Sequence, residues 1–207
     1  MTDLSPIETV MRTAPVIPVL VIEEVAHARP IAEALVAGGL PVLEVTLRTA
    51  CAVEAIEEMA RVAGATVGAG TVLNPADLRR ALDAGARFIV SPGLTDPLAR
   101  AAIEAEAPYL PGVANAADIM LGLDLGLDRF KFFPAEASGG LKALKAFAAV
   151  FGQVRFCPTG GISAATAPDW LADPAVLCVG GSWLVPRGAP DAAAITARAR
   201  DAAALAR

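Results

Sequence analysis

The feature that most constrains the fold is an alternation of short apolar runs with longer alanine-rich segments along the whole chain. Eight such runs can be read in the sequence, at residues 16–22, 41–47, 65–72, 87–93, 108–113, 129–134, 155–161 and 176–182. The segments between them have helical patterns, and two begin with a cap residue before proline, Asn74 before Pro75 and Asp96 before Pro97. This alternation predicts parallel strands joined by helices.

Eight strand–helix units predict an α/β fold, a single-domain (β/α)8 TIM barrel that spans residues 1–207. The chain is shorter than the ~250 residues typical of this fold, so we expect short connections. The alternative is an open doubly wound sheet. Its G-x-G-x-x-G fingerprint is missing, because Leu73 stands at the third glycine position after Gly68 and Gly70.

The composition limits the class of protein. Hydrophobic residues make up 55% of the chain and charged residues 19%, as in a compact globular domain. The net charge is −5 and no basic run is present, so we expect no nucleic-acid partner. No apolar segment reaches the ~20 residues needed to span a bilayer and none near the N-terminus has the form of a signal peptide, so we expect no membrane association.

The cysteines and the histidine argue against a metal centre. Cys51, Cys157 and Cys178 show no C-x-x-C spacing, which is typical of free thiols in a reducing compartment, and we expect a cytoplasmic protein. His27 is the single histidine and lies in an early helical segment, where a solvent-facing position is the simple interpretation. Chemistry without a metal or another cofactor is therefore favoured.

Lys131 stands in the strand-like run RFKFFP, between aromatic residues. Side chains alternate along a strand, so Lys131 and Phe133 share one face while Phe130 and Phe132 share the other. If that second pair packs toward the helices, Lys131 points into the barrel. The alternative is a solvated lysine on an edge strand, the ordinary interpretation of Lys142 and Lys145 in a later helical segment.

Glu44 stands among apolar neighbours in the run PVLEVTLR, with Arg48 just past the predicted strand end. A buried carboxylate and a buried amine are suited to proton transfer near neutral pH. We therefore predict that Glu44 and Lys131 form an acid–base and nucleophile pair. The alternative is a structural ion pair between Glu44 and Arg48.

Two glycine pairs follow the last two runs, in CPTGGIS at residues 157–163 and CVGGSWLVP at residues 178–186. Barrels often bind phosphate with the loops after these strands, because glycine lets backbone N–H groups approach an anion closely. The alternative is a pair of tight turns without a ligand.

Six motifs together resemble one enzyme family. They are EVTLRT (44–49), GAGTVLNP (68–75), SPGLT (91–95), FKFFPAE (130–136), FCPTGGIS (156–163) and GGSWLVP (180–186). In this order, over essentially the whole chain, they resemble the family of 2-keto-3-deoxy-6-phosphogluconate (KDPG) and 4-hydroxy-2-oxoglutarate (KHG) aldolases.

The resemblance implies a class I, Schiff-base aldolase of the Entner–Doudoroff pathway, a carbon–carbon lyase that yields pyruvate and glyceraldehyde 3-phosphate. It makes Lys131 the imine-forming amine and Glu44 the general acid and base. The other implied roles are pyruvyl carboxylate binding by Arg48 and Thr71, pyruvyl pocket lining by Pro92 and Phe133, and phosphate binding by Gly160, Gly161, Gly181 and Ser182.

The resemblance also implies a homotrimer whose partner is a small-molecule 2-keto-3-deoxy sugar acid phosphate. Two other functions stay open from the sequence. One is cleavage of 4-hydroxy-2-oxoglutarate as the main activity, and the other is a non-catalytic phosphosugar-binding barrel.

Overall fold

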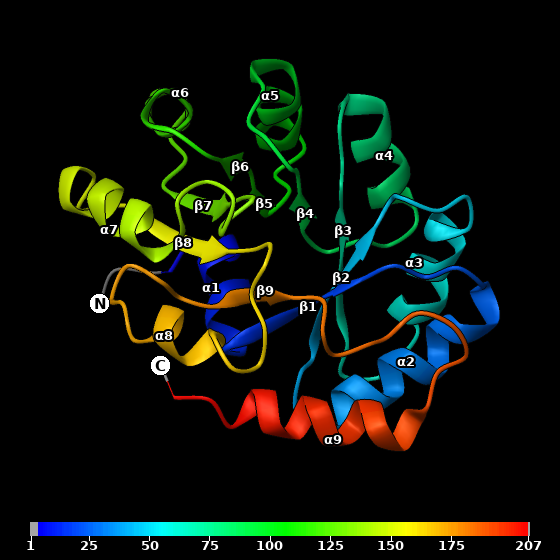
Figure 1. Ribbon diagram of the computed structural model, residues 1–207. Helices are drawn as coiled ribbons and strands as arrows, with labels where there is room; N and C mark the ends of the chain where they lie inside the picture. Colours follow the sequence, from blue (N-terminus) through cyan, green and yellow to red (C-terminus); the bar gives the residue numbers. More distant parts are fainter. Residues whose placement is uncertain (1–3, 207) are drawn as a thin grey trace.

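The computed structural model describes residues 4–206, and its helices and strands alternate as the sequence predicts (Figure 1). The strands are β1 (Val16–Leu20), β2 (Val42–Thr46), β3 (Thr66–Gly70), β4 (Ile89–Val90), β5 (Tyr109–Leu110), β6 (Gly112–Val113), β7 (Arg129–Phe132), β8 (Arg155–Pro158) and β9 (Val179–Gly181). The helices are α1 (Pro6–Thr13), α2 (Val25–Ala37), α3 (Ala52–Ala60), α4 (Pro75–Asp83), α5 (Asp96–Glu104), α6 (Ala116–Asp124), α7 (Gly140–Val150), α8 (Ala167–Leu171) and α9 (Ala192–Ala203).

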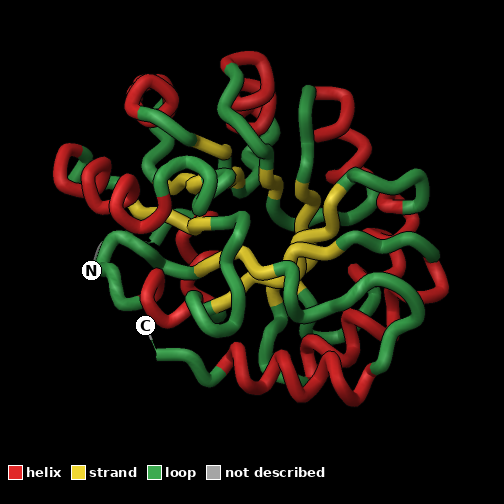
Figure 2. The backbone as a smooth tube through the Cα atoms, in the orientation of Figure 1, coloured by secondary structure: helices red, strands yellow, loops and turns green. Residues whose placement is uncertain are grey.

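The strands form two parallel sheets that curl around a common centre (Figure 2). A six-stranded sheet has the order β5-β4-β3-β2-β1-β9, and a three-stranded sheet has the order β6-β7-β8. Glu44 of β2 pairs in register with Val19 of β1 and Gly68 of β3. In the smaller sheet Lys131 of β7 pairs with Gly112 of β6 and Cys157 of β8. The parallel α/β fold is therefore confirmed as a curled sheet.

Most predicted elements are present, with local differences. The run at 108–113 is divided at Pro111 into β5 and β6. Asn74 caps α4 as predicted, because its side chain accepts hydrogen bonds from the backbone N–H groups of Ala76 and Asp77. The cap predicted at Asp96 is wrong by one residue, since Thr95 is the N-cap and Asp96 begins α5.

Helix α1 was not predicted, although its sequence carries the signals of a short helix. The Ser5 side chain accepts a hydrogen bond from the backbone N–H of Glu8, and Pro6 occupies the first turn. The apolar residues Ile7 and Met11 lie on one face of the helix and are buried. Figure 1 shows α1 behind the strands, apart from the outer ring of helices.

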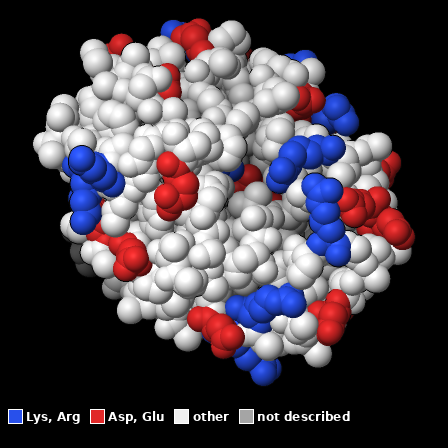
Figure 3. All heavy atoms as spheres, viewed as in Figure 1, with Lys and Arg blue, Asp and Glu red and all other residues white. Residues whose placement is uncertain are grey.

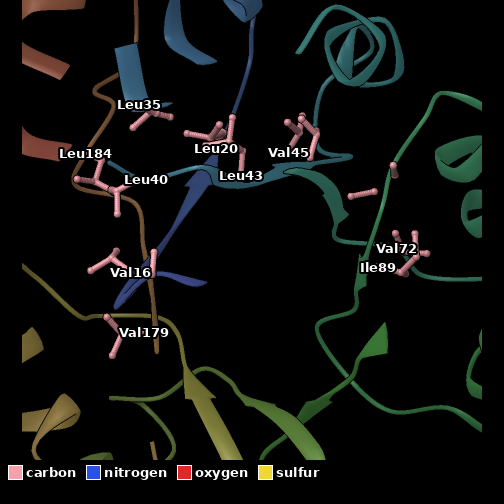
Figure 4. Packing of buried hydrophobic residues seen from close by; sticks show 14 of the residues in the cluster. Val16, Leu20, Leu35, Leu40, Leu43, Val45, Val72, Ile89, Val179 and Leu184 are labelled. Carbon is pink, nitrogen blue, oxygen red and sulfur yellow. The ribbon is translucent and has the colours of Figure 1, made fainter. Parts of the chain in front are cut away.

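The hydrophobic core has two parts. The larger lies between the strands and the outer helices, where Val16 of β1 lies beside Val179 of β9 and Leu20 faces Leu35 of α2 (Figure 4). The smaller cluster is formed by side chains of α1 together with side chains of the strands and of the residues just before β4 and β9. Its buried members are Ile7, Met11, Ile17, Val42, Phe88, Val90, Leu110, Cys157, Leu177 and Cys178.

An ion-pair network ties α1 to β7. The buried Glu8 carboxylate lies 2.7 Å from Nη2 of Arg129 and 2.7 Å from Nε of Arg12. Burial acts to raise the pKa of Glu8, but hydrogen bonds and charge from Arg12 and Arg129 outweigh it, so the pKa lies below its usual range. The network therefore stabilises the folded chain while Glu8 is ionised.

None of the described helices has the length and apolar character needed to cross a membrane.

Candidate active site

Strand β7 directs its aromatic residues outward and its lysine inward, as the alternation predicts. Phe130 and Phe132 are fully buried in the core between strands and helices. The Phe132 ring meets Phe147 of α7 edge-on at a centroid distance of 6.1 Å. These contacts fix the orientation of the strand and turn Lys131 toward its interior face.

Lys131 and Glu44 meet in the interior. The Nζ atom of Lys131 lies 3.0 Å from Oε1 of Glu44, and the exposed fractions of the two side chains are 7% and 4%. The interpretation of Lys131 as a solvated edge lysine is therefore wrong. The alternative of a Glu44–Arg48 ion pair is also wrong, since the carboxylate is held by Lys131.

Gly70 makes room for this pair. A Cβ atom added to Gly70 would lie 2.2 Å from Oε1 of Glu44, which is closer than side chains tolerate. On the other side, the Lys131 ammonium lies 5.3 Å from the centroid of the Phe133 ring, within the range of a cation–π contact. The pair is thus enclosed by strand β3 and by Phe133, and its geometry is narrowly defined.

Arg48 is held by a threonine that sequence reasoning missed. The buried hydroxyl of Thr46 donates a hydrogen bond to the carbonyl oxygen of Leu20 at 2.8 Å and accepts one from Nε of Arg48 at 3.1 Å. Thr46 and Glu44 lie two residues apart on β2 and so on the same face of the strand. This alternation is the signal that could have identified Thr46.

 The hydrogen bond to Thr46 uses the Nε atom of Arg48, so the two terminal nitrogens of the guanidinium take no part in it.

Thr71 and Pro92 lie at the ends of strands near the pair. Thr71 follows β3 directly and has a φ of 58°, a left-handed conformation that is rare for a β-branched residue. Such strain is concentrated at functional sites. The carbonyl of Pro92 packs against Gly112, where an added Cβ would lie 2.2 Å from it, and Gly112 is the register partner of Lys131.

The turn that carries Pro92 is fixed by a buried hydrogen-bond chain. The Ser91 hydroxyl donates to the carbonyl oxygen of Gly93 at 2.7 Å and lies 2.7 Å from the hydroxyl of Tyr109. Burial raises the pKa of Tyr109 to about 12, so its hydroxyl keeps the proton that it donates to Ser91 at neutral pH.

A cavity of about 390 Å³ opens beside the Lys131–Glu44 pair, and the Phe133 ring that contacts Lys131 forms part of its wall. Its lining residues come from the ends of several strands: Val19, Val21, Arg48, Phe133, Thr159, Gly160, Gly161, Ile162, Gly180, Ser182, Val185, Pro186 and Arg187. In the space-filling view the face is hollowed near its centre, with basic side chains on the rim (Figure 3). The Lys131–Glu44 pair and this cavity therefore lie next to each other, joined by Phe133.

The glycine pairs form one end of this cavity. Gly160 and Gly161 have φ values of 102° and 80°, which other residues rarely adopt, and both line it. Ser182 lines it as well, but Gly181 does not. Gly181 is buried in β9, where an added Cβ would lie 2.3 Å from the Trp183 ring. The lining residues Thr159, Gly180 and Arg187 were not predicted.

A larger cavity of about 1000 Å³ lies elsewhere and includes Arg12, Arg155 and Asp173 in its lining. It contains no buried amine beside a carboxylate. We therefore place the candidate active site at the smaller cavity, beside Lys131.

The arrangement suits the chemistry of carbonyl compounds. An amine can attack a ketone only after it has lost its proton, and the Glu44 carboxylate at 3.0 Å is placed to accept that proton. Arg48 and the glycine-rich loops offer partners for anionic groups of a ligand. Among residues 4–206, no three His, Cys, Asp or Glu side chains converge as ligands for a metal ion.

Comparisons with known proteins agree on one family. A model of the family described as KDPG and KHG aldolase matches residues 7–198. A 2-dehydro-3-deoxy-phosphogluconate aldolase of Zymomonas mobilis is 67% identical over 201 residues, which cover 97% of each chain.

Two solved structures are also similar. The 2-keto-3-deoxy-6-phosphogluconate aldolase of Zymomonas mobilis with 3-phosphoglycerate has a TM-score of 0.97 at 65% identity, over 99% of this chain and 98% of the other. The KDPG aldolase of Legionella pneumophila, with pyruvate captured as a covalent carbinolamine intermediate, has a TM-score of 0.93 at 46% identity, over 96% and 98% of the two chains.

Proposed function

Because this chain belongs to the KDPG and KHG aldolase family, we propose that it cleaves 2-keto-3-deoxy-6-phosphogluconate to pyruvate and glyceraldehyde 3-phosphate through a lysine imine. It is a carbon–carbon lyase, as its close relatives are. The observation that carries the mechanism is the buried contact between Lys131 and Glu44. A non-catalytic phosphosugar-binding barrel would not account for this pair.

In the first stage Lys131 forms a bond with the substrate. Glu44 takes a proton from the ammonium, and the free amine attacks the C2 ketone to give a carbinolamine. Glu44 then returns a proton to the carbinolamine hydroxyl, which leaves as water and yields the protonated imine. The 3.0 Å separation allows these proton transfers without a large movement of either side chain.

In the second stage the bond between C3 and C4 breaks. Glu44 accepts the proton of the C4 hydroxyl, directly or through a water molecule, and the bonding electrons move into the imine to form a neutral enamine. Glyceraldehyde 3-phosphate is then released. Protonation of the enamine at C3 and hydrolysis of the imine release pyruvate and restore Lys131.

The remaining predicted residues would bind the two ends of the substrate. Arg48 and Thr71 would hold the pyruvyl carboxylate, while Pro92 and Phe133 would enclose the pyruvyl group. At the other end Gly160, Gly161 and Ser182 would receive the phosphate through backbone N–H groups and a hydroxyl. For Gly181 we propose an indirect role, since it is buried against Trp183 and sets the path of the chain between Gly180 and Ser182.

The two sheets would form one (β/α)8 barrel, and residues 1–207 one domain. Two observations support closure. A parallel bridge joins Thr159 to Gly180, beyond the end of β8 and within β9, and β5 and β6 are separated only by Pro111.

We further propose a homotrimer in the cytoplasm. Sedimentation equilibrium would test the trimer. Cys51, Cys157 and Cys178 form no disulfide in the described part of the chain, which is compatible with a reducing compartment.

The experiment that tests this function is reductive trapping. With pyruvate and borohydride, we expect a pyruvate-derived adduct on Lys131 by mass spectrometry, and no adduct in Lys131→Met. The Lys142→Met variant is a matched control, because this exposed lysine lies on α7 and should leave the adduct unchanged. A wild-type protein that forms no adduct would contradict the imine mechanism.

A second candidate substrate is 4-hydroxy-2-oxoglutarate, which the description of the matching family includes. It has the same 2-keto group and would use the same Lys131 and Glu44. Measuring kcat/KM for both substrates decides between them, and we expect the phosphorylated substrate to have the higher value because of the glycine-rich end of the cavity.

A further inference from the structure

Arg187 lies in the segment between β9 and α9 and contributes to the lining of the active-site cavity. Its side chain is 80% exposed, and its Nη1 atom lies 3.8 Å from Oε1 of Glu23, a long distance for an ion pair. We propose that Arg187 is a specificity-determining residue that pairs with the phosphate dianion of the substrate. This inference rests on the proposed function.

The charge of the cavity supports this assignment. Gly160, Gly161 and Ser182 offer a phosphate only neutral donors, whereas a phosphate monoester carries about −1.5 to −2 charges at pH 7. The whole chain has a net charge of −5, so a local cation would favour binding of the anion at this site. The planar guanidinium of arginine matches the oxygens of a phosphate group.

The positions of the two arginines match the two charged ends of the substrate. Arg48 follows β2 and Arg187 follows β9, and they are the cationic residues among the described residues that line this cavity. Strand β1 lies between β2 and β9 in the sheet. Two strand spacings separate the two strands by about 10 Å. Arg48 would therefore hold the carboxylate at one end while Arg187 meets the phosphate at the other.

Glu23 competes with the phosphate for Arg187. It lies in the segment between β1 and α2, and its side chain is 46% exposed. An exposed pair at 3.8 Å is weak, and a phosphate dianion offers more charge and more acceptor oxygens than one carboxylate. Removing the Glu23 charge should therefore strengthen the interaction of Arg187 with phosphorylated substrates.

The test compares 2-keto-3-deoxy-6-phosphogluconate with its unphosphorylated counterpart, 2-keto-3-deoxygluconate. We expect Arg187→Gln to lower kcat/KM for the phosphorylated substrate by about five- to tenfold, with a change below about twofold for the other. Glu23→Gln should raise the first value by about twofold. In a protein that already carries Arg187→Gln, adding Glu23→Gln should have no effect, because the guanidinium that Glu23 pairs with is absent.

The control is Arg100→Gln on α5, which removes an exposed arginine that pairs with Asp96 outside the cavity lining. If this variant reproduces the effect of Arg187→Gln, the cause is net charge and the inference is wrong. Equal losses for both substrates, or no loss for either, would also overturn it.

The proposed function can fail separately. If the wild-type protein cleaves neither substrate, calorimetric titration with glycerol 3-phosphate still tests the inference. Weaker binding by Arg187→Gln than by Arg100→Gln supports a phosphate contact, whereas equal affinities refute it.

Discussion

Replacing Gly70 by alanine should disable the proposed catalytic pair without changing either of its members. The added Cβ would lie 2.2 Å from Oε1, 2.7 Å from Cγ and 2.8 Å from Cδ of Glu44. Strand β3 is held in the sheet by β2 and β4 on its two sides, so the Glu44 side chain is the group that must move. Its 3.0 Å contact with Lys131 would then be lost.

The expected effect on the rate is large. Proton transfer by a well-placed general acid or base contributes typically ~10²–10⁴-fold, and it depends on a heavy-atom distance of about 2.6–3.2 Å. We therefore expect Gly70→Ala to lower kcat by about 10²- to 10³-fold. Overpacking of a tight interior costs roughly 1–3 kcal/mol of the free energy of unfolding, so the protein should remain folded.

Gly68→Ala is the matched control. It lies on the same strand and the same face, and its added Cβ would lie 2.5 Å from the Phe88 ring instead of the carboxylate. We expect a similar loss of stability, about 1–3 kcal/mol, with kcat within about threefold of the wild type. Urea unfolding measures the first quantity, and a coupled assay of pyruvate release measures the second.

The two variants separate the effect on catalysis from the effect on packing. If folded Gly70→Ala retains wild-type kcat, the position of Glu44 does not limit the reaction. If Gly68→Ala loses as much kcat as Gly70→Ala at the same stability, the loss comes from general distortion of β3. Either result would refute the reasoning.

Two further predictions concern residues that support the site. Thr46→Val keeps the shape of the side chain but removes the hydrogen bond to Arg48, so KM for pyruvyl substrates should rise by about tenfold with a smaller change in kcat, as steady-state kinetics would show. The lowered pKa of Glu8 means that its stabilising contribution is present above the unfolded-state pKa of about 4.3 and is lost as the pH falls through the lower folded-state value. In urea unfolding between pH 2 and pH 7, Glu8→Gln should flatten this part of the pH dependence, and an unchanged acid limb would contradict the assignment.

Local patterns in the sequence account for much of the fold. The alternation of apolar runs and helical segments can be read from the spacing of apolar residues and from the glycine and proline residues that end the elements. Both signals lie in residues that are neighbours in the sequence. The alternation along β7 likewise predicts the directions of Lys131 and Phe132, because a strand turns successive side chains to opposite faces. Helix α1 shows the limit of such local prediction. Its cap residue and two apolar positions are a weak helix signal in the sequence, and their role becomes clear only when the core that they cover is known.

Distances between side chains from segments far apart in the sequence cannot be predicted from local patterns. Lys131 and Glu44 are 87 residues apart and the Glu8–Arg129 pair is separated by 121 residues, so no local pattern fixes their distances. The same holds for Gly70 beneath the Glu44 carboxylate and for Arg187 at the cavity wall.

The sequence by itself determined the alternation of strands and helices after α1, the strand face that Lys131 shares with Phe133, and the family motifs, because these depend on residues close together in the chain. Only the tertiary structure decided that Glu44 pairs with Lys131 rather than with Arg48, and that Arg187 but not Gly181 lines the cavity. The physical reason is that strand register and the curl of the sheet determine which side chains from different strands meet.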